Sequence, residues 1–225
     1  MEMMPVYAIS TETVRKLDRT PLFRHMPERM KRAERYRFEK DRLLCMGGGF
    51  LMLHVVGIRD ESEICQGQYG KPFAPGYPAF NLSHSGEWCI LSKGDCEIGV
   101  DIEKTDGKNL SAAPAVYTPR ELTWMNGDPI ERFYQLWTWK ESLIKALGTG
   151  MSLEPKTFDV MPFAEDQPVS LNGQSWYAAS GSIPGYRFSV CASSPVSSLQ
   201  WVELYLSDVD NCVPQTVLNE PDGYC

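Results

Sequence analysis

The 225-residue chain contains no apolar run that approaches the roughly 18 residues of a membrane span. It begins with Met1-Glu2-Met3-Met4-Pro5, which lacks the basic and then apolar order of a signal peptide. Its three histidines and seven cysteines include no Cys-x-x-Cys spacing, which argues against a zinc site, and the odd cysteine count argues against a disulfide framework. We therefore expect a protein that stays in the cytoplasm, has no membrane partner and keeps reduced thiols that mostly fill its core.

Positive charge is unevenly distributed along this acidic chain, whose formal net charge is −7. Residues 15–42 hold eleven of the 22 Lys and Arg against five acidic residues, so this segment carries +6 and the remainder −13. A solvated amphipathic helix would explain the segment if it stood alone. The concentration of half the cations in one place favours an anion-binding surface. No signature of base-stacking aromatic residues accompanies it, so nucleic acid is not the expected ligand.

Two short stretches supply residues for phosphate chemistry. The stretch 99–103 has the pattern of the end of a strand, where residues two apart share a face, so Asp101 and Glu103 present their carboxylates side by side. The stretch 137–145 has the pattern of the middle of a helix, where Glu141 and Lys145, four apart, project together. Three carboxylates and one ammonium suit a hard divalent cation such as Mg²⁺ that holds a phosphate-bearing ligand.

Each of these features also has an ordinary structural explanation. An Asp and a Glu two apart on a strand are most often an exposed face, and a Glu–Lys pair four apart on a helix stabilises it by roughly 0.2–0.5 kcal/mol. His84, between two serines, is more often a turn residue with satisfied hydrogen bonds than a catalyst. The combination of strand and helix carboxylates, a lysine and a separate basic segment is what favours phosphoryl-type transfer.

The chain order predicts where these motifs lie. We expect an edge strand at 6–9, a helix from about residue 12, a second helix that starts at Pro27 and ends near the three glycines 47–49, and strands at 79–85, 88–92 and up to 103. The three glycines favour a helix stop or close helix packing over a phosphate loop. We expect residues 104–118 to form a connector. A helix is expected to begin after Asp128 and to end at Gly148. Strands are expected at 158–160, 175–178, 186–191 and 200–205.

The two central motifs, in this order and spacing, resemble the paired signature of the Sfp-type 4'-phosphopantetheinyl transferases. They are Ile98-Gly99-Val100-Asp101-Ile102-Glu103 and Trp137-Thr138-Trp139-Lys140-Glu141-Ser142-Leu143-Ile144-Lys145. Tyr69-Gly70-Lys71-Pro72, residues 80–85 and residues 184–192 are also similar to pieces of that family. The resemblance covers most of the chain from about Pro27 to Ala192. The two central motifs together are highly specific, and the outer pieces support them.

The resemblance implies a role for individual residues. Asp101, Glu103 and Glu141 would bind Mg²⁺ together with the pyrophosphate of coenzyme A. Lys145 would contact that pyrophosphate and steady the departing 3',5'-ADP.

Further residues are implied for the nucleotide end of coenzyme A. Lys71, Ser83 and His84 correspond to family residues that hold it, with His84 near the 3'-phosphate. Arg29 and Arg32 match basic positions that contact the 3'-phosphate in relatives. This chain has arginine where the relatives have lysine.

The reaction implied by the resemblance is attack by a serine hydroxyl of an apo carrier protein on the β-phosphate of coenzyme A, which leaves phosphopantetheine on the serine. Glu141, directly or through a metal-bound water, is the expected base. The implied fold is α+β, with two similar lobes related by a pseudo-twofold axis and the active site between them. We expect an N-terminal lobe at 1–103 with the basic helix and first metal motif, a C-terminal lobe at 104–225 with the second motif, and a monomer.

Two other functions fit the same residues. A non-enzymatic module could use the basic segment to bind an anionic or acidic partner, with the carboxylates in a structural role. An enzyme that hydrolyses pyrophosphates could use the same metal cluster. The sequence leaves open whether the carrier serves fatty-acid, polyketide or nonribosomal-peptide synthesis, and where it docks.

Overall fold

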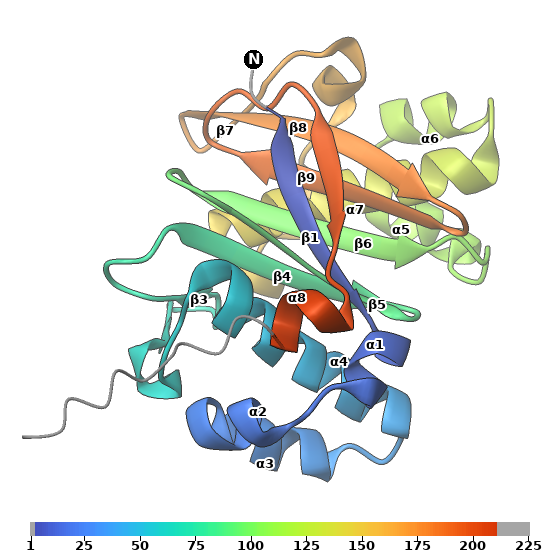
Figure 1. Ribbon diagram of the computed structural model, residues 1–225. Coiled ribbons are helices and arrows are strands. Elements are labelled where there is room, and N and C mark those ends of the chain that lie inside the picture. Colours follow the sequence, from blue (N-terminus) through green and yellow to red (C-terminus); the bar gives the residue numbers. More distant parts are fainter. Residues whose placement is uncertain (1–2, 211–225) are drawn as a thin grey trace, which may run out of the picture.

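The computed structural model describes residues 3–210 and has an α+β fold built on two four-stranded sheets (Figure 1). Its strands are β1 (Met4–Ser10), β2 (Cys65–Gln66), β3 (Pro72–Phe73), β4 (Ala79–Ser85), β5 (Trp88–Gly94), β6 (Ile98–Lys104), β7 (Val169–Leu171), β8 (Gln174–Ile183), β9 (Tyr186–Ala192) and β10 (Leu199–Glu203). Its α-helices are α1 (Thr11–Lys16), α2 (Thr20–His25), α3 (Pro27–Arg35), α4 (Glu39–Leu51), α5 (Ala113–Val116), α6 (Pro119–Met125), α7 (Pro129–Leu147) and α8 (Leu206–Asp210). The predicted α+β class with two lobes is confirmed.

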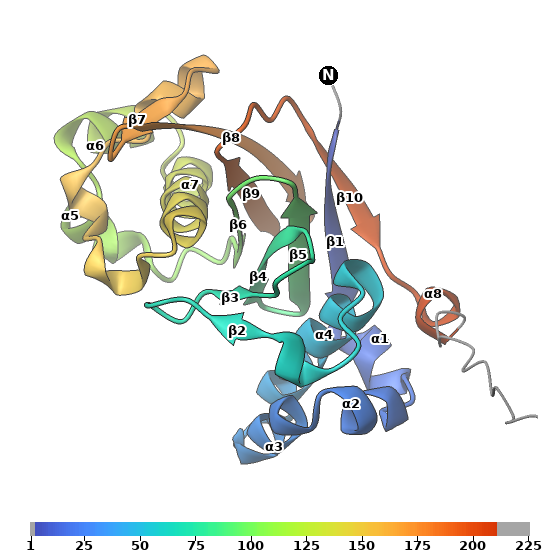
Figure 2. The ribbon, with the colours of Figure 1, turned by 90° about the vertical axis from the view of Figure 1, so that its left-hand side faces the viewer.

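The two sheets have the strand orders β10-β1-β5-β4 and β6-β9-β8-β7, and strand β4 of the first lies alongside β6 of the second. Helices α1–α4 cover one sheet and α7 covers the other, as Figure 2 shows. A third apolar cluster, with Val6, Ile90, Val100 and Val190, fills the space between the sheets. The β4–β6 seam is therefore where the two lobes meet. No helix within residues 3–210 has the length and apolar character needed to cross a membrane.

Strand pairing crosses the predicted lobe boundary twice. Strand β6, which ends at Lys104, pairs with β9 in the second sheet, and β10 returns from the end of the described chain to pair in parallel with β1. Strand β1 is therefore an inner strand, and the prediction that it lies at an edge was wrong. The division between residues 103 and 104 remains a proposal. Each sheet contains one strand from the other side of this division, namely β6 in the second sheet and β10 in the first.

Alternation along β6 decides which of its side chains reach the second lobe's helix. Ile98, Val100 and Ile102 point into the core between the sheets, so Asp101 and Glu103 point to the opposite face, toward α7. Helix α7 lies so close that a Cβ built on Gly99 would be 2.0 Å from the Ser142 carbonyl oxygen. The small residue at 99 thus sets the distance between the two motifs.

The basic segment forms two helices rather than one. Helix α3 ends at Arg35, residues 36–38 are not helical, and α4 continues through the three glycines to Leu51, followed by a π-helical turn at Met52–Val56. The expected helix end at 47–49 was wrong, and the alternative of close packing was right. A Cβ on Gly49 would be 2.8 Å from the Leu22 side chain and 2.9 Å from that of Arg29.

Helix α7 has the predicted limits. The Asp128 carboxylate accepts a hydrogen bond from the Glu131 amide at 3.3 Å, and Gly148 ends the helix in the left-handed conformation. Within the helix, Tyr134 and Thr138 are buried against neighbouring elements. The strand expected at 158–160 is absent, since these residues join two 3-10 turns.

The close approach at Gly99 predicts a large effect of adding one methyl group. Gly99→Ala should lower the free energy of unfolding by about 2–4 kcal/mol, because backbone atoms of α7 cannot move aside cheaply. Urea denaturation measures this. Gly94→Ala is the matched control, since nothing lies within 4 Å of a Cβ there, and it should change stability by less than about 0.5 kcal/mol. Equal stability of the two variants would contradict the packing described.

Candidate active site

Asp101 and Lys145 form a largely buried ion pair at the seam between the lobes. The Lys145 Nζ lies 2.6 Å from Asp101 Oδ1 and also donates to Ser83 Oγ at 2.8 Å. Ser83 Oγ in turn donates to the same Asp101 oxygen at 2.8 Å. Three residues from β4, β6 and α7 thus meet at one point. The other oxygen of Asp101, Oδ2, is buried and has no hydrogen-bond partner among the described residues.

Glu103 and Glu141 lie close enough to Asp101 for its charge to affect both. Burial, reinforced by the charge of Asp101, raises the pKa of Glu103 to about 7, although hydrogen bonds from Ser85 and Trp137 oppose the shift. Burial and Asp101 also raise the pKa of Glu141, which Lys145 partly offsets. The single ammonium of Lys145 therefore does not neutralise the three carboxylates.

The donor set suits a magnesium ion. All three side chains offer carboxylate oxygens, and Asp101 Oδ2 lacks a partner among the described residues. Burial and, second to it, the charge of Asp101 raise the pKa values of Glu103 and Glu141, and a cation would relieve the repulsion. Within residues 3–210, however, no three acidic, histidine or cysteine side chains converge as a formed metal site. In this arrangement Lys145, and not a third carboxylate, is the immediate neighbour of Asp101.

Hydrogen bonds from the side chains of β4 join this strand to β6 across the seam, although the two strands belong to different sheets. Asn81 accepts a hydrogen bond from the Val100 amide at 2.9 Å, and Ser85 donates to Glu103 Oε2 at 3.0 Å. Together with Ser83, these residues alternate along the strand and so share the face toward β6. Ser83 thus belongs with the carboxylates, whereas the next residue, His84, projects to the other face. The polar residues at every second position of β4 were a signal for this seam.

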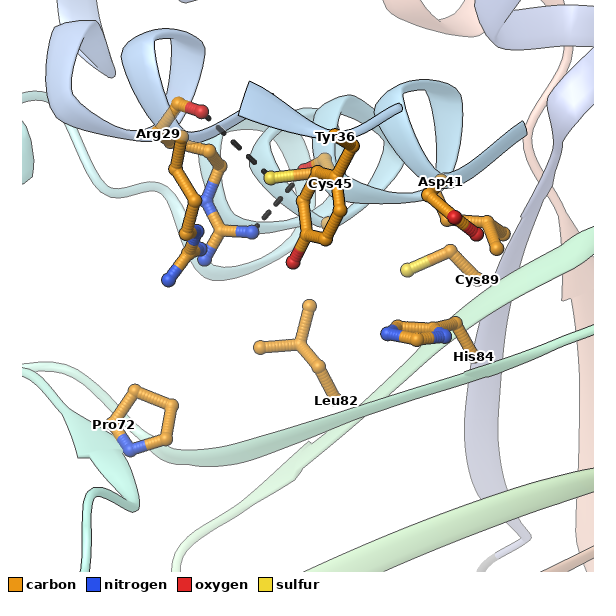
Figure 3. A pocket seen from close by; sticks show the side chains of 11 residues that line it. Arg29, Tyr36, Asp41, Cys45, Pro72, Leu82, His84 and Cys89 are labelled. Carbon is orange, nitrogen blue, oxygen red and sulfur yellow. Dashed lines mark hydrogen bonds between the residues drawn. The ribbon is translucent and has the colours of Figure 1, made fainter. Parts of the chain in front are cut away.

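A pocket of about 300 Å³ lies on the other face of β4, beneath helices α3 and α4 (Figure 3). It is lined by Arg29, Arg32, Tyr36, Asp41, Leu44, Cys45, Gly48, Pro72, Leu82, His84 and Cys89. The two arginines and the histidine predicted to hold a 3'-phosphate are thus brought together, although they come from α3 and β4. Cationic side chains around a small pocket suit a phosphate group. Tyr36, Asp41 and the thiols of Cys45 and Cys89 also line the pocket, although no sequence motif indicated them.

Arg29 is held in place by the glycines of α4. Its guanidinium Nη1 donates to the Cys45 carbonyl oxygen at 3.1 Å, and its side chain packs beside Gly48 and Gly49. Burial, with the charge of Arg32 acting in the same direction, lowers the pKa of Arg29 from its high ordinary value. Its Nε has no partner among the described residues. A larger residue at 48 or 49 would displace the cation from the pocket.

Comparison with known proteins agrees with this arrangement. A family profile described as the 4'-phosphopantetheinyl transferase superfamily matches residues 97–191. The 4'-phosphopantetheinyl transferase Sfp of Bacillus subtilis (strain 168) is 32% identical to the chain over 185 residues, which are 75% of this chain and 82% of that protein. The chain belongs to the 4'-phosphopantetheinyl transferase family. This enzyme therefore transfers 4'-phosphopantetheine to carrier proteins, as the two central motifs predicted.

Other relatives of this transferase are more distant or matched over a smaller part. The 4'-phosphopantetheinyl transferase gsp of Aneurinibacillus migulanus is 26% identical over 188 residues, which are 77% of each chain. The L-aminoadipate-semialdehyde dehydrogenase-phosphopantetheinyl transferase of Xenopus laevis is 33% identical over 163 residues, 60% of this chain and 54% of that protein.

Lys71 of the transferase does not line the pocket beneath α3 and α4. Its Nζ donates to the Ala146 carbonyl oxygen at 2.8 Å and to Glu97 Oε2 at 3.0 Å. It thereby satisfies one of the last carbonyls of α7, next to Lys145 in the sequence. The predicted contact of Lys71 with the nucleotide remains a prediction, and in this structure the side chain ties the Gly70–Pro72 loop to the helix.

The central helix of the transferase also carries a structural lysine. Lys140 Nζ lies 2.9 Å from Glu121 Oε1 and donates to the carbonyl oxygens of Pro155 and Phe158, and both charged side chains are buried. Glu121 also completes a capping box with Thr118, a spacing that the sequence displays. This buried pair fixes α7 to the loops behind it and takes no part in the carboxylate group.

The raised pKa of Glu103 predicts how the stability of the metal-free transferase depends on pH. Folding takes up a proton here, because the pKa is about 7 in the folded protein and near the ordinary 4.5 in the unfolded chain. The contribution of Glu103 to the free energy of unfolding is fully present below the pKa of the unfolded chain. It is lost as the pH rises through about 7. Relative to Glu103→Gln, which cannot ionise, the wild-type melting temperature in chelator should fall between about pH 4.5 and 7. A difference between the two proteins that does not change with pH would contradict this.

Proposed function

We propose that the transferase uses coenzyme A as donor and Mg²⁺ as cofactor. The observation that carries the proposal is the seam itself, where Asp101 pairs with Lys145 and its charge acts on Glu103 and Glu141, one strand away from a cationic pocket. A molecule with a 3'-phosphate at one end and a pyrophosphate next to it matches two adjacent anion sites. Binding energy from the remote phosphate would orient the reacting pyrophosphate.

The two ends of the substrate would bind to different groups of residues. Arg29, Arg32 and His84 would hold the 3'-phosphate in the pocket beneath α3 and α4. Asp101, Glu103 and Glu141 would hold the magnesium ion, whose chemistry is to neutralise negative charge on the pyrophosphate oxygens. The Lys145 side chain is partly exposed, so its ammonium can reach the leaving phosphate.

Glu141 is the proposed general base. It lies on α7 one turn before Lys145, so its carboxylate is on the side proposed for the pyrophosphate and can accept a proton directly or through a metal-bound water. It would take the proton from the hydroxyl of a carrier serine as the serine oxygen bonds to the β-phosphorus of coenzyme A. The bond from that phosphorus to the bridging oxygen breaks, and 3',5'-ADP leaves with its charge stabilised by Lys145.

The first test measures transfer of phosphopantetheine from coenzyme A to a carrier protein in the presence of Mg²⁺. The transferase is incubated with Mg²⁺, coenzyme A and a panel of apo carriers from fatty-acid, polyketide and nonribosomal-peptide synthesis, and the carrier mass is measured. We expect a phosphopantetheine gain on the serine of at least one carrier. No gain on any carrier would contradict the proposal, and release of 3',5'-ADP without a carrier would favour pyrophosphate hydrolysis.

Asp101→Ala should abolish this transfer without unfolding the protein, because it removes the carboxylate on which the seam converges. Asp95→Ala, which removes an exposed carboxylate from the β5–β6 turn, is the matched control and should keep its activity. Melting curves check folding. Full activity of Asp101→Ala would remove the metal proposal.

Arg32→Ala should raise KM for coenzyme A about tenfold with little change in kcat, since the loss of one phosphate contact weakens binding uniformly. Arg35→Ala is the control, because Arg35 is exposed on the same helix and does not line the pocket. Steady-state kinetics with coenzyme A and with its 3'-dephospho form separate the two effects. A KM for the dephospho form that rises as much as that for coenzyme A would show that Arg32 does not bind the 3'-phosphate.

A monomer is the proposed working form, because one chain supplies both motifs and both sides of the seam. Light scattering of the active protein tests this.

A further inference from the structure

We propose that Lys145 occupies the cation position of the metal-free transferase, and that Mg²⁺ and the ammonium of Lys145 compete for Asp101. This inference rests on the proposed magnesium site. It adds that the lysine has two positions, one on Asp101 before the metal binds and one on the substrate pyrophosphate afterwards.

The geometry at Asp101 carries the first step of the argument. A carboxylate that is 3% exposed needs a counter-charge, and the only one in contact with it among the described residues is Lys145, 2.6 Å away. Ser83 bridges the same two atoms with hydrogen bonds of 2.8 Å, so the ammonium sits in a small polar cradle. Asp101 Oδ2 is buried and has no hydrogen-bond partner among the described residues, so the neutralisation of this carboxylate depends on Lys145.

The second step is that two cations cannot share this carboxylate cheaply. A divalent ion on Asp101 would lie close to the ammonium in a poorly hydrated site, where like charges repel strongly. One of the two must therefore move.

The third step decides which partner moves. Asp101 lies in the middle of β6, paired to Ser189 of β9 and covered by α7, and its side chain is 4% exposed. The Lys145 side chain is 27% exposed and has a long flexible stem, so it can leave without unfolding any element. Release from Asp101 would direct the ammonium outward to the pyrophosphate. Metal binding would thus prepare the group that stabilises the leaving phosphate.

The deciding experiment measures metal binding without coenzyme A or a carrier. Mn²⁺ affinity is determined by electron paramagnetic resonance for wild type and Lys145→Met. Loss of the competing ammonium should tighten Mn²⁺ binding about tenfold, whereas a cation acting only on the substrate would leave it unchanged. Lys104→Met, which removes an exposed lysine next to Glu103, is the charge-matched control and should change affinity less than about twofold. Equal tightening in both lysine variants would overturn the proposal, because it would reflect net charge alone.

Wild-type protein gives an independent measurement if Lys145→Met folds poorly. The ¹³Cε resonance of Lys145, assigned with Lys145→Arg, should shift as Mg²⁺ saturates the protein, while that of Lys104 stays in place. An unmoved Lys145 resonance at saturation would overturn the competition. Mn²⁺ that does not bind wild type at all, or that binds Asp101→Ala equally well, would instead contradict the underlying metal site.

Discussion

The contact between helix α7 and strand β6 is the constraint on which the rest of the site depends. With only a hydrogen atom at the Cα of Gly99, backbone meets backbone there, and the next turns of α7 come to lie over Asp101. Lys145 can then reach across the seam to the carboxylate and to Ser83 of the other sheet. A wider separation would leave a buried, unpaired charge on β6.

The same seam supports the proposed binding of a substrate with two separated phosphate groups. Strand β4 is an edge strand of its sheet and presents Ser83 to the carboxylates on one face and His84 to the arginine pocket on the other. The carboxylate seam and the arginine pocket are therefore one strand apart. The seam takes residues from both halves of the chain, whereas the pocket is lined by residues 29–89 alone. The proposed transfer would therefore depend on the packing of the two lobes at this seam.

Local patterns predicted the parts of this arrangement that depend on neighbours in sequence. The cap at Asp128 and the stop at Gly148 fix α7, and alternation on β6 places Asp101 and Glu103 on one face. The two motifs together identified the family.

Contacts between distant residues were not predictable in the same way. Lys71 meets the end of α7 through a carbonyl 75 positions away, and the burial of Lys140 depends on Glu121 and on loops beyond residue 150. The break at 36–38 has no glycine or proline to signal it, and it makes Tyr36 a pocket residue. The close packing of Gly49 depends on the side chains of Leu22 and Arg29, which are distant from it in the sequence.

A crystal structure with coenzyme A and Mn²⁺, recorded near the manganese absorption edge, tests the central claim most directly. The account predicts an anomalous peak bonded to Asp101, Glu103 and Glu141 at the seam, with Lys145 Nζ on the pyrophosphate and the 3'-phosphate beside Arg29, Arg32 and His84. A peak at another place, or a nucleotide bound outside the pocket beneath α3 and α4, would contradict it.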